Sequence, residues 1–254
     1  MSVREYPQFS GIAEYYDALM CGVPYRRWMR YLQRIFTLRG LKPLTVLDLA
    51  CGTGTVSELF CMNGLDVVGV DISEEMIRKA QSKADEQELN ISYHTMNAAE
   101  LDLSEKPFDL CVSLFDSLNY ITDPSELRKA IRCVFDHVRP GGLFIFDINS
   151  AFALQFNFFD QENMMSDDKL RYCWKSLYEP STRLCSVNMR FYVRQKNGED
   201  REFVETHLQF AYREAELREM LTQAGFTDIE TYHAYTFAPV SETTDRIFFV
   251  ANRP

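Results

Sequence analysis

Two acidic residues bracket a short glycine-containing segment near residue 50. Asp48 opens the run Asp-Leu-Ala-Cys-Gly-Thr-Gly, which ends at Gly54, and Asp71 closes the apolar run DVVGVD farther along the chain. Gly52 and Gly54 allow a tight turn and let a ligand lie against bare main chain. A helix after such a turn presents unpaired N–H groups, and a carboxylate at the end of the next strand can accept hydrogen bonds from a ribose diol. These residues predict a binding site for a nucleoside-containing ligand.

This layout fits two classes of nucleoside ligand. A dinucleotide fold carries the pattern G-x-G-x-x-G, but the third glycine position is occupied here by Ser57. Asp48 would also repel a pyrophosphate, whereas it suits the ammonium group of a methionine-like tail. Both departures favour S-adenosylmethionine (SAM) over a nicotinamide dinucleotide, and they disfavour an oxidoreductase.

The elements around these residues follow an α/β rhythm. Apolar runs that read as short strands alternate with helices, which is typical of a parallel sheet with right-handed crossovers. Two last strands, near 227–235 and 245–252, are too close in sequence for a parallel crossover, so the final strand is expected to be antiparallel. We therefore predict an α/β fold with a seven-stranded sheet. The earlier strands are expected at 44–50, 66–71, 91–96, 108–114 and 142–148.

The alternation of strands and helices stops between residues 150 and 210. Three segments of alternating character, LRYCWKSLYE, RLCSVNMRFYVRQ and REFVETHLQFAY, predict strands, and the Asn-Gly pair in KNGED predicts a hairpin turn. This region is expected to be an antiparallel β insertion. A helix from Arg213 to Ala224 follows, and the first 40 residues read as amphipathic helix. One apolar helix face there consists of Tyr25, Trp28, Met29, Leu32, Ile35 and Phe36.

Composition limits the classes of partner. The 254 residues carry a formal net charge of −10, which opposes nucleic-acid binding. The seven cysteines are odd in number and lack C-x-x-C spacing, so we expect reduced thiols and no metal site. No apolar stretch approaches the ~18 residues of a membrane span. The expectation is a cytoplasmic protein without membrane contact, either a monomer or a homodimer.

Several motifs together resemble class I SAM-dependent methyltransferases. VLDLACGTG looks like their first motif, VVGVDIS like their second, MNAAELD like their adenine-contacting loop, and VRPGGLFIFDIN like their turn into the fifth strand. FSGIAEYYDALM, YRRW and LFDSLNYI resemble a small-molecule subgroup. The resemblance implies a Rossmann-like methyltransferase sheet in four parts. These are an N-terminal helical lid (1–40), a SAM-binding core (41–149), the β insertion as a substrate lid (150–210) and a C-terminal completion of the sheet (211–254).

The same resemblance implies which residues contact the cofactor. Trp28 and Met76 could equally be ordinary core residues, and the sequence does not separate Tyr15 from Tyr16. Asn97 stands where an aspartate usually meets the adenine amino group. The implied cofactor residues are Tyr16, Trp28, Asp48, Ala50, Gly52, Gly54, Asp71, Ile72, Met76, Asn97, Ala98, Leu114 and Phe115.

Methyl transfer from a sulfonium requires alignment and exclusion of water more than a covalent nucleophile. An oxygen acceptor would need a base, for which Tyr16 or His207 could serve, although a lone histidine is often structural. Insertion aromatics such as Phe203 could wall a pocket or fill a small core. Candidate substrate contacts are Asp116, Asn119, Arg190 and Tyr192.

The predicted function is methyl transfer from SAM to a nitrogen or oxygen atom of a small molecule, with S-adenosylhomocysteine as product. A protein or nucleic-acid methyltransferase is the alternative, but no Asn-Pro-Pro-Tyr-like tetrapeptide follows the fourth strand, where the sequence reads Phe-Asp-Ser-Leu. A non-catalytic SAM-binding protein would carry the same motifs. The insertion could roof the active site or form a dimer surface.

Overall fold

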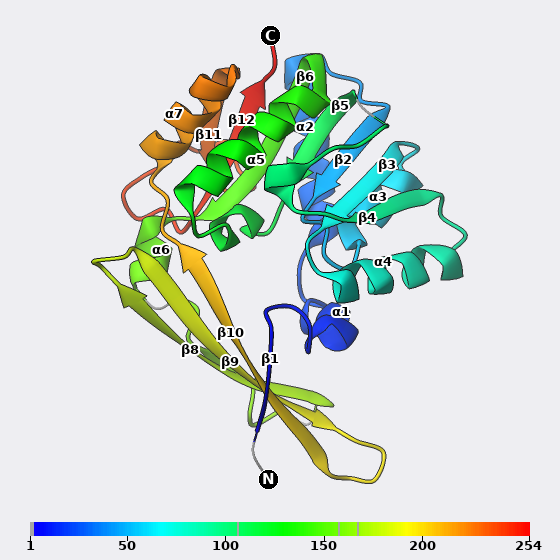
Figure 1. The fold of residues 1–254 in the computed structure, drawn as a ribbon, viewed down its shortest axis with the longest axis vertical. Helices are drawn as coiled ribbons and strands as arrows, with labels where there is room; N and C mark the ends of the chain where they lie inside the picture. Colours follow the sequence, from blue (N-terminus) through cyan, green and yellow to red (C-terminus); the bar gives the residue numbers. More distant parts are fainter. Residues whose placement is uncertain (1–2, 106, 157, 167) are drawn as a thin grey trace.

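The computed structural model describes residues 3–105, 107–156, 158–166 and 168–254. They form a seven-stranded sheet with helices on both faces and a five-stranded sheet that extends from one end of it (Figure 1). Among these residues no helix is long and apolar enough to span a membrane.

The seven-stranded sheet is the core of the molecule. Its strands are β2 (Thr45–Leu49), β3 (Asp66–Asp71), β4 (Ile91–Thr95), β5 (Phe108–Ser113), β6 (Val138–Asn149), β11 (Thr227–His233) and β12 (Arg246–Asn252). The order is β11-β12-β6-β5-β2-β3-β4. Neighbours from β6 to β4 pair in parallel, whereas β12 runs antiparallel to both β6 and β11. The predicted seven-stranded sheet with an antiparallel last strand is confirmed.

The helices begin and end where local chemistry allows. The Ser73 hydroxyl accepts a hydrogen bond from Met76 N at the start of one helix, and Asp123 accepts one from Ser125 N at the start of another. The longer helices are α2 (Tyr25–Arg39), α3 (Thr55–Met62), α4 (Glu74–Glu86), α5 (Pro124–His137) and α7 (Glu214–Ala224). Shorter turns are η1 (Ala13–Tyr15), α1 (Tyr16–Leu19), η2 (Ala98–Glu100), η3 (Ser117–Tyr120) and α6 (Ala151–Gln155).

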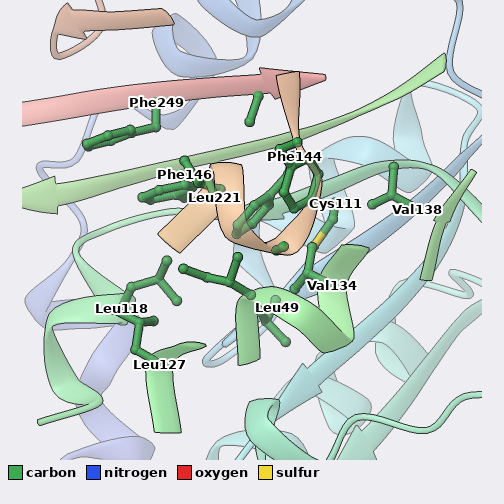
Figure 2. Close-up of a cluster of buried hydrophobic side chains, with 14 of the residues drawn as sticks. Leu49, Cys111, Leu118, Leu127, Val134, Val138, Phe144, Phe146, Leu221 and Phe249 are labelled. Carbon is green, nitrogen blue, oxygen red and sulfur yellow. The ribbon is translucent and has the colours of Figure 1, made fainter. Parts of the chain in front are cut away.

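Two apolar clusters hold the helices on the sheet. One joins α5 and α7 to one face, and Figure 2 shows its Val134 and Leu221 beside the sheet phenylalanines. There the rings of Phe146 and Phe249 stack with centroids 4.7 Å apart. The other cluster joins α2 and α3 to the opposite face. The two clusters thereby hold the carboxyl ends of the parallel strands together at one edge of the sheet.

The five-stranded sheet is mainly the predicted antiparallel insertion. Its strands are β1 (Arg4–Tyr6), β7 (Gln161–Glu162), β8 (Leu170–Glu179), β9 (Leu184–Arg194) and β10 (Asp200–Phe210), in the order β1-β10-β9-β8-β7. The β8–β9 and β9–β10 pairs are antiparallel. One face of β9 is fully buried and forms a small core of its own with the N-terminal segment. We call this unit the second sheet.

The N-terminal segment is helical only in part, contrary to the expectation for its first residues. Arg4–Tyr6 pair in parallel with β10, at the edge of the second sheet (Figure 1). Helical turns begin at Ala13 and the long helix at Tyr25. The strand forms because the edge of β10 offers unpaired main-chain groups, a long-range partner that a helical pattern cannot reveal.

Two glycines with left-handed backbone allow a test of the packing around α7. A Cβ atom at Gly225 (φ 108°) would lie 2.8 Å from Cζ of Phe135, whereas one at Gly64 (φ 84°) would meet no atom within 4 Å. We expect Gly64→Ala to lower the free energy of unfolding by about 1 kcal/mol, because only the backbone is strained. Gly225→Ala should lower the free energy of unfolding by about 1–3 kcal/mol more than Gly64→Ala does, because its Cβ atom would also clash with the Phe135 ring. Urea titrations measure both, and equal losses would contradict the packing.

Candidate functional site

A cavity of about 470 Å³ lies at the carboxyl ends of β2, β3 and β5. Its walls are those strand ends, one face of β8, β9 and β10, and side chains of the segment between Phe9 and Trp28. The end beside residues 48–53 is called the glycine-turn end, and the end beside Trp174 and His207 is called the second-sheet end. Among the described residues, no group of three or more His, Cys, Asp or Glu side chains is placed to hold a metal ion.

The turn after β2 exposes its main chain to the cavity. Ala50 and Gly52 have φ values of 58° and 56°, and a Cβ atom at Gly52 would meet no atom within 4 Å. The N–H of Gly52 donates to Oδ2 of Asp71 over 2.9 Å, and Oδ1 of Asp71 accepts from Ser73 N. Gly54 differs, because a Cβ there would lie 2.3 Å from the Tyr93 hydroxyl. Gly54 is thus required for packing against β4 and does not line the cavity.

Asp48 is buried below this turn. Its Oδ2 accepts a hydrogen bond from the Ser57 hydroxyl over 2.5 Å. Burial raises the pKa of Asp48 to about 7, against the lowering effect of the Ser57 bond, and it also raises the pKa of Asp71. Ser57, at the third glycine position of the dinucleotide pattern, is therefore the hydrogen-bond partner of Asp48. The sequence alone did not reveal this role. A carboxylate of this kind favours a cation above it.

The main chain after β5 is strained and held by one carboxylate. Phe115 and Asp116 have φ values of 67° and 53°. Their N–H groups donate to the two oxygens of Asp147 over 2.8 and 3.1 Å, and Asp147 is fully buried. Arg246 pairs with Asp147 and, over 2.7 Å, with Asp116. Burial raises the pKa of Asp116, against the lowering effect of Arg246.

The same network continues into the second sheet. Oδ2 of Asp116 accepts from Nε2 of Gln209, on β10, over 2.9 Å. Asn149 donates to Oε1 of Gln209. Asn119 donates to the carbonyls of Asn149 and Phe210 and accepts from Asn149 N, so it joins the two sheets. The prediction that Asn119 contacts a substrate is corrected, because its amide is engaged in these bonds and does not line the cavity.

Aromatic rings form much of the remaining wall. Trp28 lines the cavity, and its ring stacks on Tyr235 at 4.3 Å with an angle of 5°. Tyr16 lines the cavity, whereas Tyr15 lies against Phe203 in the core of the second sheet, which settles the ambiguity between the two tyrosines. Burial raises the pKa of Tyr16 well above its usual value. A phenol with a raised pKa keeps its own proton and cannot accept another, so Tyr16 is not a good candidate for proton removal.

Two of the predicted substrate residues, Arg190 and Tyr192, are not on the face of the second sheet that lines the cavity. Met189, Phe191 and His207 line the cavity. Arg190 and Tyr192 alternate with them along β9 and point to the other face, where Arg190 pairs with Glu202 over 2.6 Å. These two predictions are therefore corrected. Phe203 is fully buried, stacks on Phe191 and fills the small core.

The other predicted residues at the glycine-turn end lie together. Asn97 caps a short turn by accepting from Ala99 N over 3.0 Å. Ile72 is 71% exposed, whereas Met76 is buried. All three, with Ala98, Leu114 and Phe115, line the cavity. Asp17, on α1, ties the N-terminal segment to this end, because it accepts from the Thr53 hydroxyl and pairs with Lys83 over 3.0 Å.

Comparisons with known proteins agree with this geometry. Residues 46–142 match the model of a family described as "Methyltransferase domain". The chain is 32% identical over 247 residues to "Putative methyltransferase GWCH70_2453" of Geobacillus sp. (strain WCH70), covering 96% of this chain and 99% of that protein. A crystal structure of an S-adenosylmethionine-dependent methyltransferase from Clostridium acetobutylicum ATCC 824 superposes with a TM-score of 0.84 at 30% identity, covering 96% and 98% of the two chains.

The chain belongs to the SAM-dependent methyltransferases. It is therefore an enzyme that uses SAM as cofactor. A more distant relative is the dTDP-3-amino-3,4,6-trideoxy-alpha-D-glucopyranose N,N-dimethyltransferase of Streptomyces venezuelae, 27% identical over 189 residues, which are 71% of this chain and 74% of that protein.

The glycine-turn end of this methyltransferase fits its cofactor. The bare main chain at Gly52 leaves room that a side chain would fill. Asp71 offers carboxylate oxygens at the end of β3, and Asp48 offers a buried carboxyl group. Ile72, Met76 and Ala98 supply apolar surface of the kind that a purine ring needs.

The ion pair of Arg246 is open to a direct test. Arg246→Met would leave the buried carboxylates of Asp116 and Asp147 without their cation, and we expect a loss of about 3 kcal/mol in the free energy of unfolding. The matched control is Arg190→Met, which breaks an exposed pair with Glu202 and should cost less than about 1 kcal/mol. Urea unfolding of both variants measures the difference. Similar losses would contradict the assignment of Arg246 as a buried structural cation.

Proposed function

We propose that this enzyme transfers a methyl group from SAM to a nitrogen or oxygen atom of a small molecule bound at the second-sheet end. The observation that carries the proposal is the cavity itself, which runs from the glycine turn to a wall of aromatic side chains on the second sheet. Its volume of about 470 Å³ is in the range of small-molecule sites. A protein or nucleic-acid substrate would need an open groove, and nucleic acid would also need a basic surface, which the net charge of −10 opposes.

The residues of the glycine-turn end are assigned to the cofactor. Asp71 accepts hydrogen bonds from the ribose hydroxyls, and Ala50 and Gly52 present main chain to the amino-acid part. Asp48 attracts its ammonium group. Asn97, Ile72, Met76 and Ala98 surround the adenine, while Tyr16, Trp28, Leu114 and Phe115 border the methionine part.

SAM supplies an electrophilic methyl group on a sulfonium, which already has a good leaving group. The protein contributes alignment, which can supply on the order of 7–11 kcal/mol in favourable cases, and exclusion of water. Asp147 fixes Phe115 and Asp116 beside the reacting centre. Aromatic faces near the sulfonium favour its positive charge.

The N-terminal segment and the second sheet are proposed to roof the site. The bond from Thr53 to Asp17 and the Asp17–Lys83 pair tie α1 to the turn that binds SAM. Release of these contacts would open the cavity for exchange of product. The amino-sugar methyltransferase among the relatives acts on a small molecule, which supports the same substrate size here. Dimerisation through the outer face of the second sheet remains compatible with a roof on its inner face.

The proposed activity is tested by S-adenosylhomocysteine formation. Purified protein, SAM and a panel of hydroxyl- and amine-bearing metabolites are incubated, and product is measured by mass spectrometry. A methylated small molecule is the expected result. Methylation of added RNA or protein with none of the small molecules modified would overturn the proposal.

Cofactor binding is expected to depend on the carboxylate at the end of β3. Asp71→Asn removes one negative oxygen and should weaken SAM binding at least about tenfold, because a charged hydrogen bond contributes about 1.5–3 kcal/mol. Asp66→Asn, at the exposed start of the same strand, is the matched control and should leave the affinity unchanged. Calorimetry measures both, with circular dichroism to check the fold. Equal affinities for the two variants would exclude Asp71 from the site.

The affinity for SAM should also depend on pH through Asp48. Only the ionised carboxylate attracts a cation, and its raised pKa of about 7 means that the charge is present above pH 7 and lost below it. Between pH 8 and pH 6 the ionised fraction falls about tenfold, and the affinity should fall in proportion. Asp48→Asn lacks this titration, so the affinity of that variant should vary less between pH 8 and pH 6 than the affinity of the wild type. The same pH profile in both proteins would contradict the assignment.

A further inference from the structure

Two buried polar atoms at the second-sheet end lack a hydrogen-bond partner in the described part of the chain. They are Nδ1 of His207 and Nε1 of Trp174, and both residues line the cavity. Trp174 pairs with Met189 across β8 and β9, and His207 pairs with Val187 across β9 and β10. Directly paired residues and residues two apart share a face of a sheet, so both side chains face inward. A buried polar atom without a partner costs free energy unless a ligand supplies one.

The environment of His207 fixes which ring nitrogen carries the lone pair. Nε2 of His207 lies 2.7 Å from Oε2 of Glu205. The same carboxylate accepts from the main-chain N–H groups of Phe9 and Ile12, each over 2.9 Å. A carboxylate in this position is an acceptor, so the hydrogen is on Nε2 and the lone pair on Nδ1. Phe9 and Tyr120 contact the ring edge-to-face, with centroids 4.5 and 5.8 Å away, and hold it in place.

The charged residues of the cavity exclude an acceptor that carries a phosphate or carboxylate group. Arg246 is the sole Lys or Arg among the lining residues that the structure describes, and it is already paired with Asp116 and Asp147. The remaining charged lining residues are Asp48 and Asp71. A phosphate or carboxylate on the acceptor would find no free cation and would meet negative charge. The acceptor therefore carries no phosphate or carboxylate group, unlike the nucleotide-linked sugar of the Streptomyces relative.

Building on the proposed methyl transfer, we infer that the acceptor is a phenol without a phosphate or carboxylate group, whose hydroxyl proton is taken by Nδ1 of His207. Phe9, Tyr172, Trp174 and Phe191 provide flat apolar surface for its ring. The N–H of Trp174 donates to a second oxygen of the same ring. Glu205 is a positioning residue that holds the His207 ring and, through Phe9 and Ile12, the N-terminal segment.

The step balances in atoms and charge. The phenol oxygen forms a bond to the methyl carbon of SAM as the carbon–sulfur bond breaks, and the electron pair stays on sulfur to give S-adenosylhomocysteine. The hydroxyl proton moves to Nδ1 of His207 and later leaves to water. The Glu205 carboxylate stabilises the imidazolium that forms meanwhile. A neutral amine brings its own lone pair, whereas a hydroxyl needs this base.

The test compares two probes that differ in their need for a base. Catechol has a protonated hydroxyl at pH 8, whereas 4-nitrocatechol is largely ionised there. We expect wild-type enzyme to form S-adenosylhomocysteine with both. His207→Gln should lower kcat for catechol at least about 100-fold, with little change for 4-nitrocatechol. Trp174→Phe should mainly raise KM for both. His94→Gln, a histidine outside the cavity lining, is the matched control and should behave as wild type.

Each other outcome overturns a defined part of the inference. Equal losses with the two probes in His207→Gln would show a structural role for the histidine. Turnover of aniline or benzoate but of neither catechol would exclude a phenol as acceptor. Failure of both catechols in wild-type enzyme that still binds SAM by calorimetry would also exclude the phenol and leave methyl transfer standing. Failure to bind SAM would instead overturn the proposed function.

Discussion

The buried carboxylate of Asp147 is the interaction on which the site depends. It lies on β6 and neutralises Arg246 from β12, while its two oxygens hold the N–H groups of Phe115 and Asp116 in a left-handed backbone that such residues rarely adopt. Asp116 in turn accepts from Gln209 of the second sheet. Through Asp116, this carboxylate thus joins the core sheet, the strained loop that lines the cavity and the second sheet.

A second buried carboxylate organises the opposite wall in the same way. Glu205 is fully buried, and main-chain N–H groups of Phe9 and Ile12 satisfy it together with His207. The N-terminal segment therefore lies against the cavity at the place where it also completes the hydrogen bonds of a buried carboxylate. If this segment opened, as we propose for product release, the carboxylate that orients the histidine would lose two hydrogen bonds, which would be costly.

Features with a local cause could be predicted from the sequence. The glycine turn and the strand–helix alternation depend on neighbouring residues, and the comparisons bear out the fold, the SAM cofactor and the methyltransferase activity. The errors came from register and from long-range bonds. Arg190 and Tyr192 differ from cavity-lining neighbours by one position in β9, and the alternation of apolar residues was the signal that could have separated them. Arg246 was missed because its partners are far away in sequence.

The central claim is that the core sheet, the second sheet and the N-terminal segment enclose one cavity in which methyl transfer occurs. A crystal structure of the full chain with S-adenosylhomocysteine tests it most directly. The account predicts the ribose on Asp71 and the sulfur atom inside the cavity, open toward His207 and Trp174, with Glu205 still bonded to the N-terminal segment. A sulfur atom that faces bulk solvent, or a second sheet swung away from it, would contradict the account.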